Sequence, residues 1–173
     1  MNRSAPLGWV RGSAGSLAVL FGVLWAWERF TSAEPVPAEG PTPVELTVVG
    51  GPELNPNAQG RASPVLVRVF DLAAAKTFES ADYEALFEHP GDVLKHDLIA
   101  QEEFVLRPGD IQQHDRSLQP QVQALGVAAG FRDLEHAVWR LTVPIRRGRR
   151  NFLLIDLDRD RIRLVTVDPG HPQ

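Results

Sequence analysis

The sequence predicts a mainly β domain, an antiparallel two-sheet β-sandwich with one short helical insertion. Three observations support this fold class. From Val44 onward, apolar residues recur at every second position, as in strands with one buried face. Turn signals rich in glycine, proline and aspartate interrupt this pattern at short intervals, which is typical of sandwiches. Only between Ser80 and Leu98 does the apolar spacing become that of a helix.

Seven or eight short strands are expected. The segments with strand periodicity are 44–48, 65–72, 104–106, 111–118, 122–131, 138–145, 152–157 and 162–166. The segment 65–72 (VLVRVFDL) has the most β-branched residues and is expected to be buried. The segment 111–118 is polar, and it fits either an edge strand or a loop.

The helical insertion is short and begins near Ser80, whose side chain is expected to cap its first turn. Tyr83, Leu86 and Phe87 then share one face at i, i+3 and i+4, and the segment 89–91 (HPG) ends the helix. Because open sheet edges are commonly covered by helices or loops, we expect the insertion to lie over one edge or one end of a sheet.

The N-terminal 33 residues have the pattern of a secretory signal or an uncleaved membrane anchor. Basic residues precede a short apolar stretch, 17–27, and small residues follow at 31–33. Residues 34–43 (EPVPAEGPTP) are proline-rich and predict an extended linker. The β-sandwich domain is expected over 44–167, with a short tail at 168–173. This order predicts a domain delivered outside the cytoplasm.

Charge and composition exclude several classes of protein. Without Arg3, Arg11, Arg29 and Glu28, the 18 basic and 22 acidic residues become 15 and 21, a net charge of −6, which argues against a general nucleic-acid binder. The chain has no cysteine, which excludes disulfides and thiolate metal sites. No nucleophile elbow, phosphate-binding glycine loop or histidine metal motif is present, so we expect neither an enzyme nor a cofactor.

Two charged segments have more than one interpretation. The aspartates at 156, 158 and 160 resemble the start of a calcium loop, but Arg161 and Val167 stand where such a loop needs glycine and glutamate, so we interpret the segment as a charged turn. Arg146–Arg150 places four arginines in five residues. This segment is either a solvated hairpin tip or a site for an acidic partner or a lipid phosphate.

The segment Leu54–Leu72 joins a turn-rich loop to the best-defined strand. Asn55-Pro56-Asn57 favours a tight turn, and Gly60 adds a second permissive position. An elaborate loop that precedes a rigid strand is typical of a recognition loop. An ordinary connection without a partner is the alternative.

An ordered set of short motifs resembles the TssJ family, the outer-membrane lipoprotein of the type VI secretion system. These motifs are Asn55-Pro56, Gly60-Arg61-x-Ser63-Pro64, VLVRVFDL, Phe78, Ala81-Asp82-Tyr83, Leu86, Asp97-Leu98, Glu102-Glu103, Leu106-x-Pro108-Gly109, Gly126-Val127, Phe131-Arg132 and Trp139-Arg140. They extend over about residues 44–167. The resemblance implies a transthyretin-like sandwich in a non-enzymatic component of the secretion membrane complex.

The resemblance also implies a partner, the periplasmic C-terminal region of the inner-membrane protein TssM. In that family the loop between the first two strands makes an important part of the contact, and here that loop is Gly51–Ser63. The implied partner-binding residues are Leu54, Asn55, Pro56, Asn57, Gln59, Gly60 and Arg61. A periplasmic sandwich that binds a small ligand or a glycan through clustered aromatic residues is the alternative function.

One feature departs from the family. Its members are anchored by a lipid on the first cysteine after the signal, and this chain contains no cysteine. For the sequence as printed we therefore expect an uncleaved inner-membrane anchor or a soluble periplasmic form. The alternative is a translation start that omits the true signal.

Overall fold

The computed structural model describes residues 40–165, and these residues form eight strands and a few short helices. The elements in order are β1 (Thr42–Gly50), β2 (Val65–Leu72), α2 (Lys76–Ser80), α3 (Tyr83–Glu88), α4 (Pro90–Leu94), the 3-10 helix η1 (Lys95–Asp97), β3 (Leu98–Leu106), β4 (Ile111–Leu118), β5 (Ala124–Ala129), β6 (Arg140–Pro144), β7 (Asn151–Asp158) and β8 (Arg161–Val165). The predicted mainly β fold is confirmed, and the polar segment 111–118 is a strand.

The predicted signal or anchor and the predicted tail lie outside the described residues. Of the predicted linker, Gly40 and Pro41 precede regular structure, whereas Thr42 and Pro43 already belong to β1. Among residues 40–165, no helix is long and apolar enough to cross a membrane.

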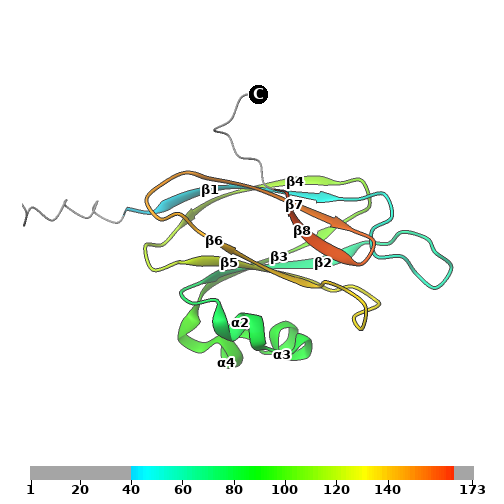
Figure 1. Cartoon of the computed structure of the whole chain (residues 1–173), viewed down its shortest axis with the longest axis horizontal. Helices are drawn as coiled ribbons and strands as arrows, with labels where there is room; N and C mark the ends of the chain where they lie inside the picture. Colours follow the sequence, from blue (N-terminus) through cyan, green and yellow to red (C-terminus); the bar gives the residue numbers. More distant parts are fainter. Residues whose placement is uncertain (1–39, 166–173) are drawn as a thin grey trace, which may run out of the picture. The chain divides into compact units, whose positions relative to one another are not determined.

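The strands form two four-stranded sheets that pack face to face (Figure 1). The strand orders are β4-β1-β7-β8 and β3-β2-β5-β6. Most neighbours are antiparallel as predicted, but β1 and β7 are parallel, with Val44 opposite Asn151 and Gly50 opposite Leu157. This pair corrects the expectation of a wholly antiparallel sandwich. It also places the start of β1 beside the β6–β7 turn and the end of β1 beside the β7–β8 turn.

The period-two pattern of the sequence produces the core between the sheets. In β1 the residues Val44, Leu46 and Val48 are buried, and in β2 the residues Val65, Val67 and Val69 are buried. They pack with Leu106, Leu118, Leu125, Val127, Ile155 and Leu157 from the other strands. At about 25 cal/mol per Å² of buried apolar surface, this cluster is the main source of stability.

A second, smaller core holds the helices against the outer face of the sheet that contains β2. Phe70 and Leu72 of β2 and Ala128 of β5 are buried there with Phe78 and residues of α3 and α4. The helices therefore cover a face of the sheet, where we had expected an edge or an end (Figure 1). The reason is that β2 carries the apolar residues Phe70 and Leu72 on its outer face, so this face also needs a cover.

The predicted helix cap is wrong. Ser80 ends α2, where its hydroxyl donates to the Lys76 and Thr77 carbonyls, and Asp82 precedes α3 without a side-chain cap bond. At the other ends of the helices, arginines from the sheet bind the backbone carbonyls. Arg68 donates to the Leu86 and Phe87 carbonyls at the end of α3, and Arg140 donates to the carbonyls of Phe78 within α2 and of Ala81 just after it. These cations satisfy carbonyls that the short helices leave unpaired.

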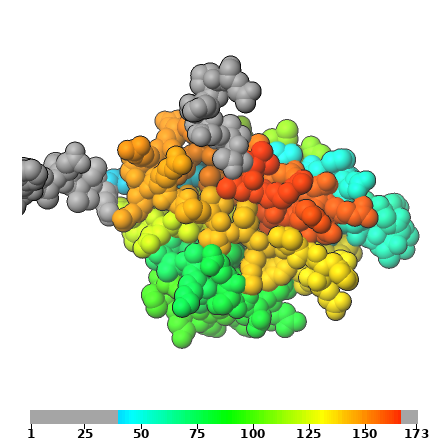
Figure 2. Space-filling model, viewed as in Figure 1, coloured from blue at the N-terminus to red at the C-terminus, as the bar shows by residue number. Residues whose placement is uncertain are grey.

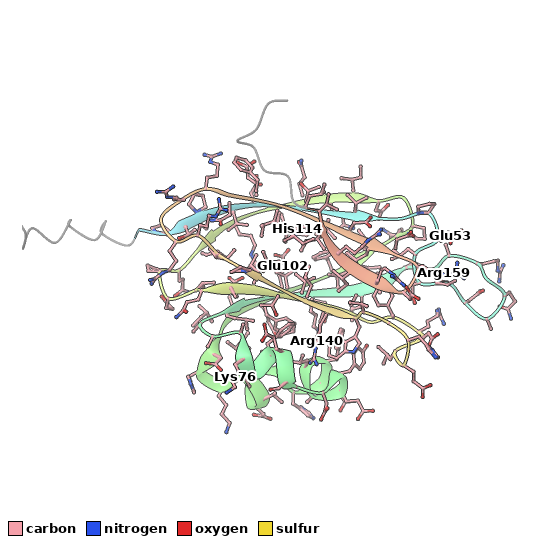
Figure 3. The ribbon with its side chains drawn as sticks, in the orientation of Figure 1. Glu53, Lys76, Glu102, His114, Arg140 and Arg159 are labelled. Atoms are coloured by element: carbon pink, nitrogen blue, oxygen red, sulfur yellow. The ribbon has the colours of Figure 1, made fainter. Side chains whose placement is uncertain are left out.

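Charged side chains also lie between the two sheets, at the edge formed by β3 and β4. Arg116 Nη2 lies 2.9 Å from Asp71 Oδ1, and Arg116 Nη1 lies 3.8 Å from Glu102 Oε2. Glu102 Oε1 also lies 2.8 Å from His114 Nδ1 (Figure 3). We call Asp71, Glu102, His114 and Arg116 the inter-sheet ionic cluster.

Burial raises the pKa of the Asp71 carboxyl above its usual value, the Arg116 guanidinium lowers it, and Glu102 raises it further. Asp71 is therefore held in the interior mainly by its ion pair with Arg116.

Candidate partner-binding site

Three connections meet at the end of the sandwich where β1 finishes. They are the β1–β2 loop (51–64), the β5–β6 connection (130–139) and the β7–β8 turn (159–160), which we call the loop cluster. The parallel β1–β7 pair brings the first and third together, because Gly51 N donates to Leu157 O at 2.7 Å. A Cβ at Gly51 would lie 2.3 Å from Asp158 Oδ1, so this close approach requires glycine.

Asn55 joins all three connections. Its Nδ2 donates to Pro64 O at 2.8 Å, its Oδ1 accepts from Arg132 N at 2.9 Å, and its own backbone N donates to Arg159 O at 2.8 Å. Its φ is +48°, a left-handed conformation that asparagine tolerates better than most residues. Because only 4% of Asn55 is exposed, its role is to position the loop.

Leu54 is fully buried and belongs to the main core. The carbonyl of Leu54 accepts a bond from Ser63 N at 2.8 Å, which closes the base of the loop just before β2. Leu54 and Asn55 were predicted as contact residues, but the structure places both inside the domain.

The tip of the loop is exposed and internally ordered. Asn57 Oδ1 accepts from the backbone N of Gln59 and of Arg61, each at 3.0 Å. Gly60 has φ +74°, and its N donates to Asn57 O at 2.8 Å. Residues 58–62, which include Gln59, Gly60 and Arg61, are exposed, and Pro56 and Asn57 are partly buried. The tip is thus a preformed turn that presents its side chains to solvent.

An open pocket of about 440 Å³ lies beside the tip. Residues 55–58, 131–133 and 159–160 line it, so each part of the loop cluster contributes to its wall. Phe131 is the apolar aromatic residue of the pocket lining. The rim of the pocket carries both signs of charge, from Arg132, Asp133, Arg159 and Asp160.

Ion pairs order the charged rim. Arg159 Nη1 donates to Glu53 Oε2 at 2.8 Å, which ties the β7–β8 turn to the β1–β2 loop (Figure 3). His136 Nδ1 lies 2.8 Å from Asp133 Oδ1, and the hydrogen bond that the imidazole donates to this carboxylate, together with its negative charge, raises the pKa of His136 above its usual value. The rim therefore offers donors and acceptors in a fixed arrangement, which suits a polar protein surface better than an apolar ligand.

Sequence reasoning missed Arg132, Asp133, Arg159 and Asp160 as members of this site. The 158–160 turn was recognised, but nothing placed it beside the loop, because an antiparallel sheet would have turned the end of β7 away from the end of β1.

The other charged and aromatic candidates lie elsewhere. Asp156 pairs with Arg163 at 2.6 Å and Asp160 with Arg161 at 3.0 Å, as expected for a charged turn. Tyr83 packs on Phe87 and Trp139, with ring centroids 4.3 and 5.3 Å apart. These three aromatic side chains pack on one another beside α3, and none of the three lines the pocket.

The fold and the loop cluster define a class of protein, a two-sheet β-sandwich that presents a preformed binding loop at one end. The particular family follows from comparison with known proteins. Residues 42–160 match the family of type VI secretion lipoproteins described as VasD, EvfM, TssJ and VC_A0113, and the chain belongs to this family. It is a structural component of the type VI secretion system, and the predicted two-sheet β-sandwich of the TssJ family is confirmed.

Solved structures agree with this assignment. The lipoprotein TssJ1 from Pseudomonas aeruginosa is 36% identical, with a TM-score of 0.73 over 76% of this chain and 99% of that one. A chain in the solved structure of the TssM C-terminal domain from EAEC is 29% identical (TM-score 0.63; 72% and 98% covered). A chain in a type VI membrane complex is 28% identical (TM-score 0.64; 72% and 98% covered). No curated protein sequence shows significant similarity to the chain.

Proposed function

We propose that this chain is a non-enzymatic component of the type VI secretion membrane complex that binds the periplasmic C-terminal region of TssM through its β1–β2 loop. The observation that carries the proposal is the loop itself. Its base is buried and bonded to two other connections, while its tip is ordered and residues 58–62 are exposed. Such a preformed loop loses little conformational entropy on binding. The similarity to chains in a TssM structure and in a membrane complex supports the choice of partner.

The predicted binding residues have two different roles in this proposal. Gln59, Gly60 and Arg61 at the tip make the contact, and Pro56 and Asn57 form the adjoining pocket wall. Leu54 and Asn55 act indirectly by holding the loop in place. Arg61 is the strongest contact candidate, because arginine is enriched among residues that dominate interface energies.

A double substitution of two exposed residues at the tip of the loop tests this contact. We expect Gln59→Ala/Arg61→Glu to weaken binding of the TssM C-terminal region by at least about tenfold, since a hot-spot residue contributes about 2 kcal/mol or more. Calorimetric titration of the purified domain, residues 40–173, provides the measurement. This part is suitable because it contains both sheets and the residues that match the family model, 42–160.

The matched control is Lys76→Glu, the same charge reversal on an exposed residue of α2, away from the loop cluster (Figure 3). The control should bind like the parent, and all three proteins should share one melting temperature because no changed side chain is buried. Equal affinity of the tip variant and the parent would refute the assignment of the loop.

The proposed location is the periplasm, with the N-terminal segment as the membrane attachment. The sequence pattern of residues 1–33 supports export, and the absence of cysteine leaves acylation without an acceptor in the printed sequence. Fractionation of cells that express the full chain is expected to place it in the inner membrane or the soluble periplasm. Recovery in the cytoplasm would overturn the location, and recovery in the outer membrane would overturn both forms of attachment.

A further inference from the structure

The turn between β6 and β7 is held in a fixed shape by two buried polar residues. Asn151 Oδ1 accepts from Arg146 N at 2.9 Å, and Asn151 Nδ2 donates to the carbonyls of Arg146 and Arg149 at 3.1 and 2.8 Å. Thr42 Oγ1 accepts from Gly148 N at 2.9 Å. Asn151 and Thr42 are only 7% and 1% exposed. These hydrogen bonds therefore join the turn to Thr42, the first residue of β1.

This turn concentrates positive charge in a domain of negative net charge. All four of its arginines are exposed, and we call the segment Arg146–Arg150 the arginine turn. Arg150 pairs with Glu45 at 2.6 Å. Within residues 40–165, Arg146 and Arg149 form no ion pair. At least two guanidinium groups thus remain for an external anion, and a rigid turn presents them.

The arginine turn lies where the chain enters the domain. Residues 34–41 precede β1, and at about 3.1 Å per residue an extended proline-rich segment of that length reaches only about 25 Å. Six more residues, 28–33, separate this segment from the apolar stretch 17–27, so the whole connection of 14 residues reaches at most about 43 Å. A membrane that holds the apolar stretch therefore lies within about 43 Å of the start of β1 and the adjoining arginine turn, and phospholipid phosphates are the anions it would present.

We propose that the arginine turn is a docking surface for anionic phospholipid headgroups at the membrane to which the N-terminal segment attaches. Exposed guanidinium groups bind phosphate oxygens through charge-assisted hydrogen bonds, and each cation near an anionic membrane surface strengthens binding about fivefold. The fixed backbone of the turn allows several arginines to reach one surface together.

Docking in this way orients the domain. The nine residues of β1 run from the arginine turn to the loop cluster, and at about 3.3 Å per residue they separate the two ends by about 30 Å. Figure 2 shows the turn (orange) and the β1–β2 loop (green-blue) at opposite ends of the molecule. A domain docked by its arginine turn would hold its β1–β2 loop away from the membrane, in the direction of a partner.

Vesicle binding of the domain, residues 40–173, tests the proposal without the contribution of the apolar N-terminal segment. We compare phosphatidylcholine vesicles with and without phosphatidylglycerol in a cosedimentation assay at low ionic strength. The parent is expected to bind only the anionic vesicles and to be released by salt. Arg146→Gln/Arg149→Gln should bind at least about tenfold more weakly, and Arg146→Lys/Arg149→Lys should bind like the parent because it keeps both charges.

The control is Arg107→Gln/Arg163→Gln, which removes two exposed charges from other parts of the domain and gives the same net charge. It should keep its vesicle binding.

Equal loss in this control, no preference of the parent for anionic vesicles, or full binding by Arg146→Gln/Arg149→Gln would each overturn the proposal. The last outcome would favour an acidic protein as the occupant. TssM binding should be unchanged in Arg146→Gln/Arg149→Gln, so the two proposals fail separately.

Discussion

Asn55→Ala is expected to lower the free energy of unfolding by about 2–4 kcal/mol and to abolish TssM binding. The alanine removes both side-chain hydrogen bonds and leaves Arg132 N and Pro64 O unpaired in a part-buried site. An unpaired group costs about 1–3 kcal/mol when it is fully buried, and each of these two part-buried groups is expected to cost about 1 kcal/mol, at the lower end of that range. Alanine also adopts φ +48° less readily than asparagine, which adds about 1 kcal/mol. Chemical denaturation and calorimetric titration measure the two effects.

Two further substitutions separate these causes. Asn55→Gly keeps the left-handed backbone but loses both hydrogen bonds, so it should recover only the backbone part of the loss. Asn55→Asp keeps the acceptor for Arg132 N, but its second carboxylate oxygen faces the Pro64 carbonyl where the parent has a donor, so it should be no more stable than Asn55→Ala at neutral pH. Identical stability of Asn55→Ala and the parent would show that Asn55 does not hold the loop cluster together.

Binding data on the same variants distinguish positioning from contact. Because Asn55 is buried, its variants should weaken TssM binding in the order of their loss of stability. A variant of the exposed tip should weaken binding with no loss of stability. If Asn55→Ala were as stable as the parent yet unable to bind, Asn55 would itself be a contact residue, and the division of roles in the loop would be wrong.

The sequence predicted the strands well because one physical rule governs them. Residues such as Val44, Leu46 and Val48 alternate with polar residues, and this pattern fixes which face is buried whatever the neighbouring strand is. It does not fix which strands pair. The parallel β1–β7 pair joins chain segments about a hundred residues apart, such as Val44 and Asn151, and the local sequence pattern does not predict which distant strands become neighbours.

The helical insertion shows where local signals mislead. Ser80 is a good N-cap by residue type, yet it lies at the end of α2, and Arg68 and Arg140, which are distant in sequence, bind the carbonyls at the C-terminal ends of the helices. One signal for the position of the helices was available. Val69, Phe70, Asp71 and Leu72 are all buried, and Phe70 and Leu72 break the one-faced pattern of the strand. Apolar residues on the outer face of a strand indicate that something must cover that face.

The candidate site was predicted in part for the same reasons. Asn57 and Gly60 form a turn through bonds within five residues, so sequence reasoning could find the tip. The pocket wall from Arg132 and Arg159 depends on tertiary pairing and was missed. Burial of Leu54 and Asn55 was also missed, because turn chemistry describes the backbone of a loop and not which of its side chains face inward.

Arg116→Met is expected to lower the free energy of unfolding by about 3–5 kcal/mol at pH 7, since it leaves a buried carboxylate without its cation. Asp71 is 6% exposed and depends on Arg116 at 2.9 Å, while Glu102 adds repulsion. The matched control is Arg163→Met, which breaks an exposed pair with Asp156 and should cost no more than about 1 kcal/mol. Urea denaturation of the three proteins provides the measurement.

The pH dependence of this loss identifies its cause. The pKa of Asp71 is raised in the folded domain, so between its usual and its raised value the folded state binds more protons, and stability falls as pH rises through that window. Loss of Arg116 removes the positive charge that lowers the pKa of Asp71. The pKa of Asp71 in the folded domain then rises further, so the pH range over which stability is lost extends to higher pH. The deficit of Arg116→Met should therefore be largest at neutral pH and shrink as the pH falls and Asp71 becomes protonated.

Asp71→Leu/Arg116→Met removes both charges and should recover most of the stability, because replacing a whole buried ion pair with apolar residues is often neutral or stabilising. A deficit that is constant with pH, or that the double variant does not relieve, would mean that Arg116 acts through packing and that the inter-sheet ionic cluster does not depend on its charge.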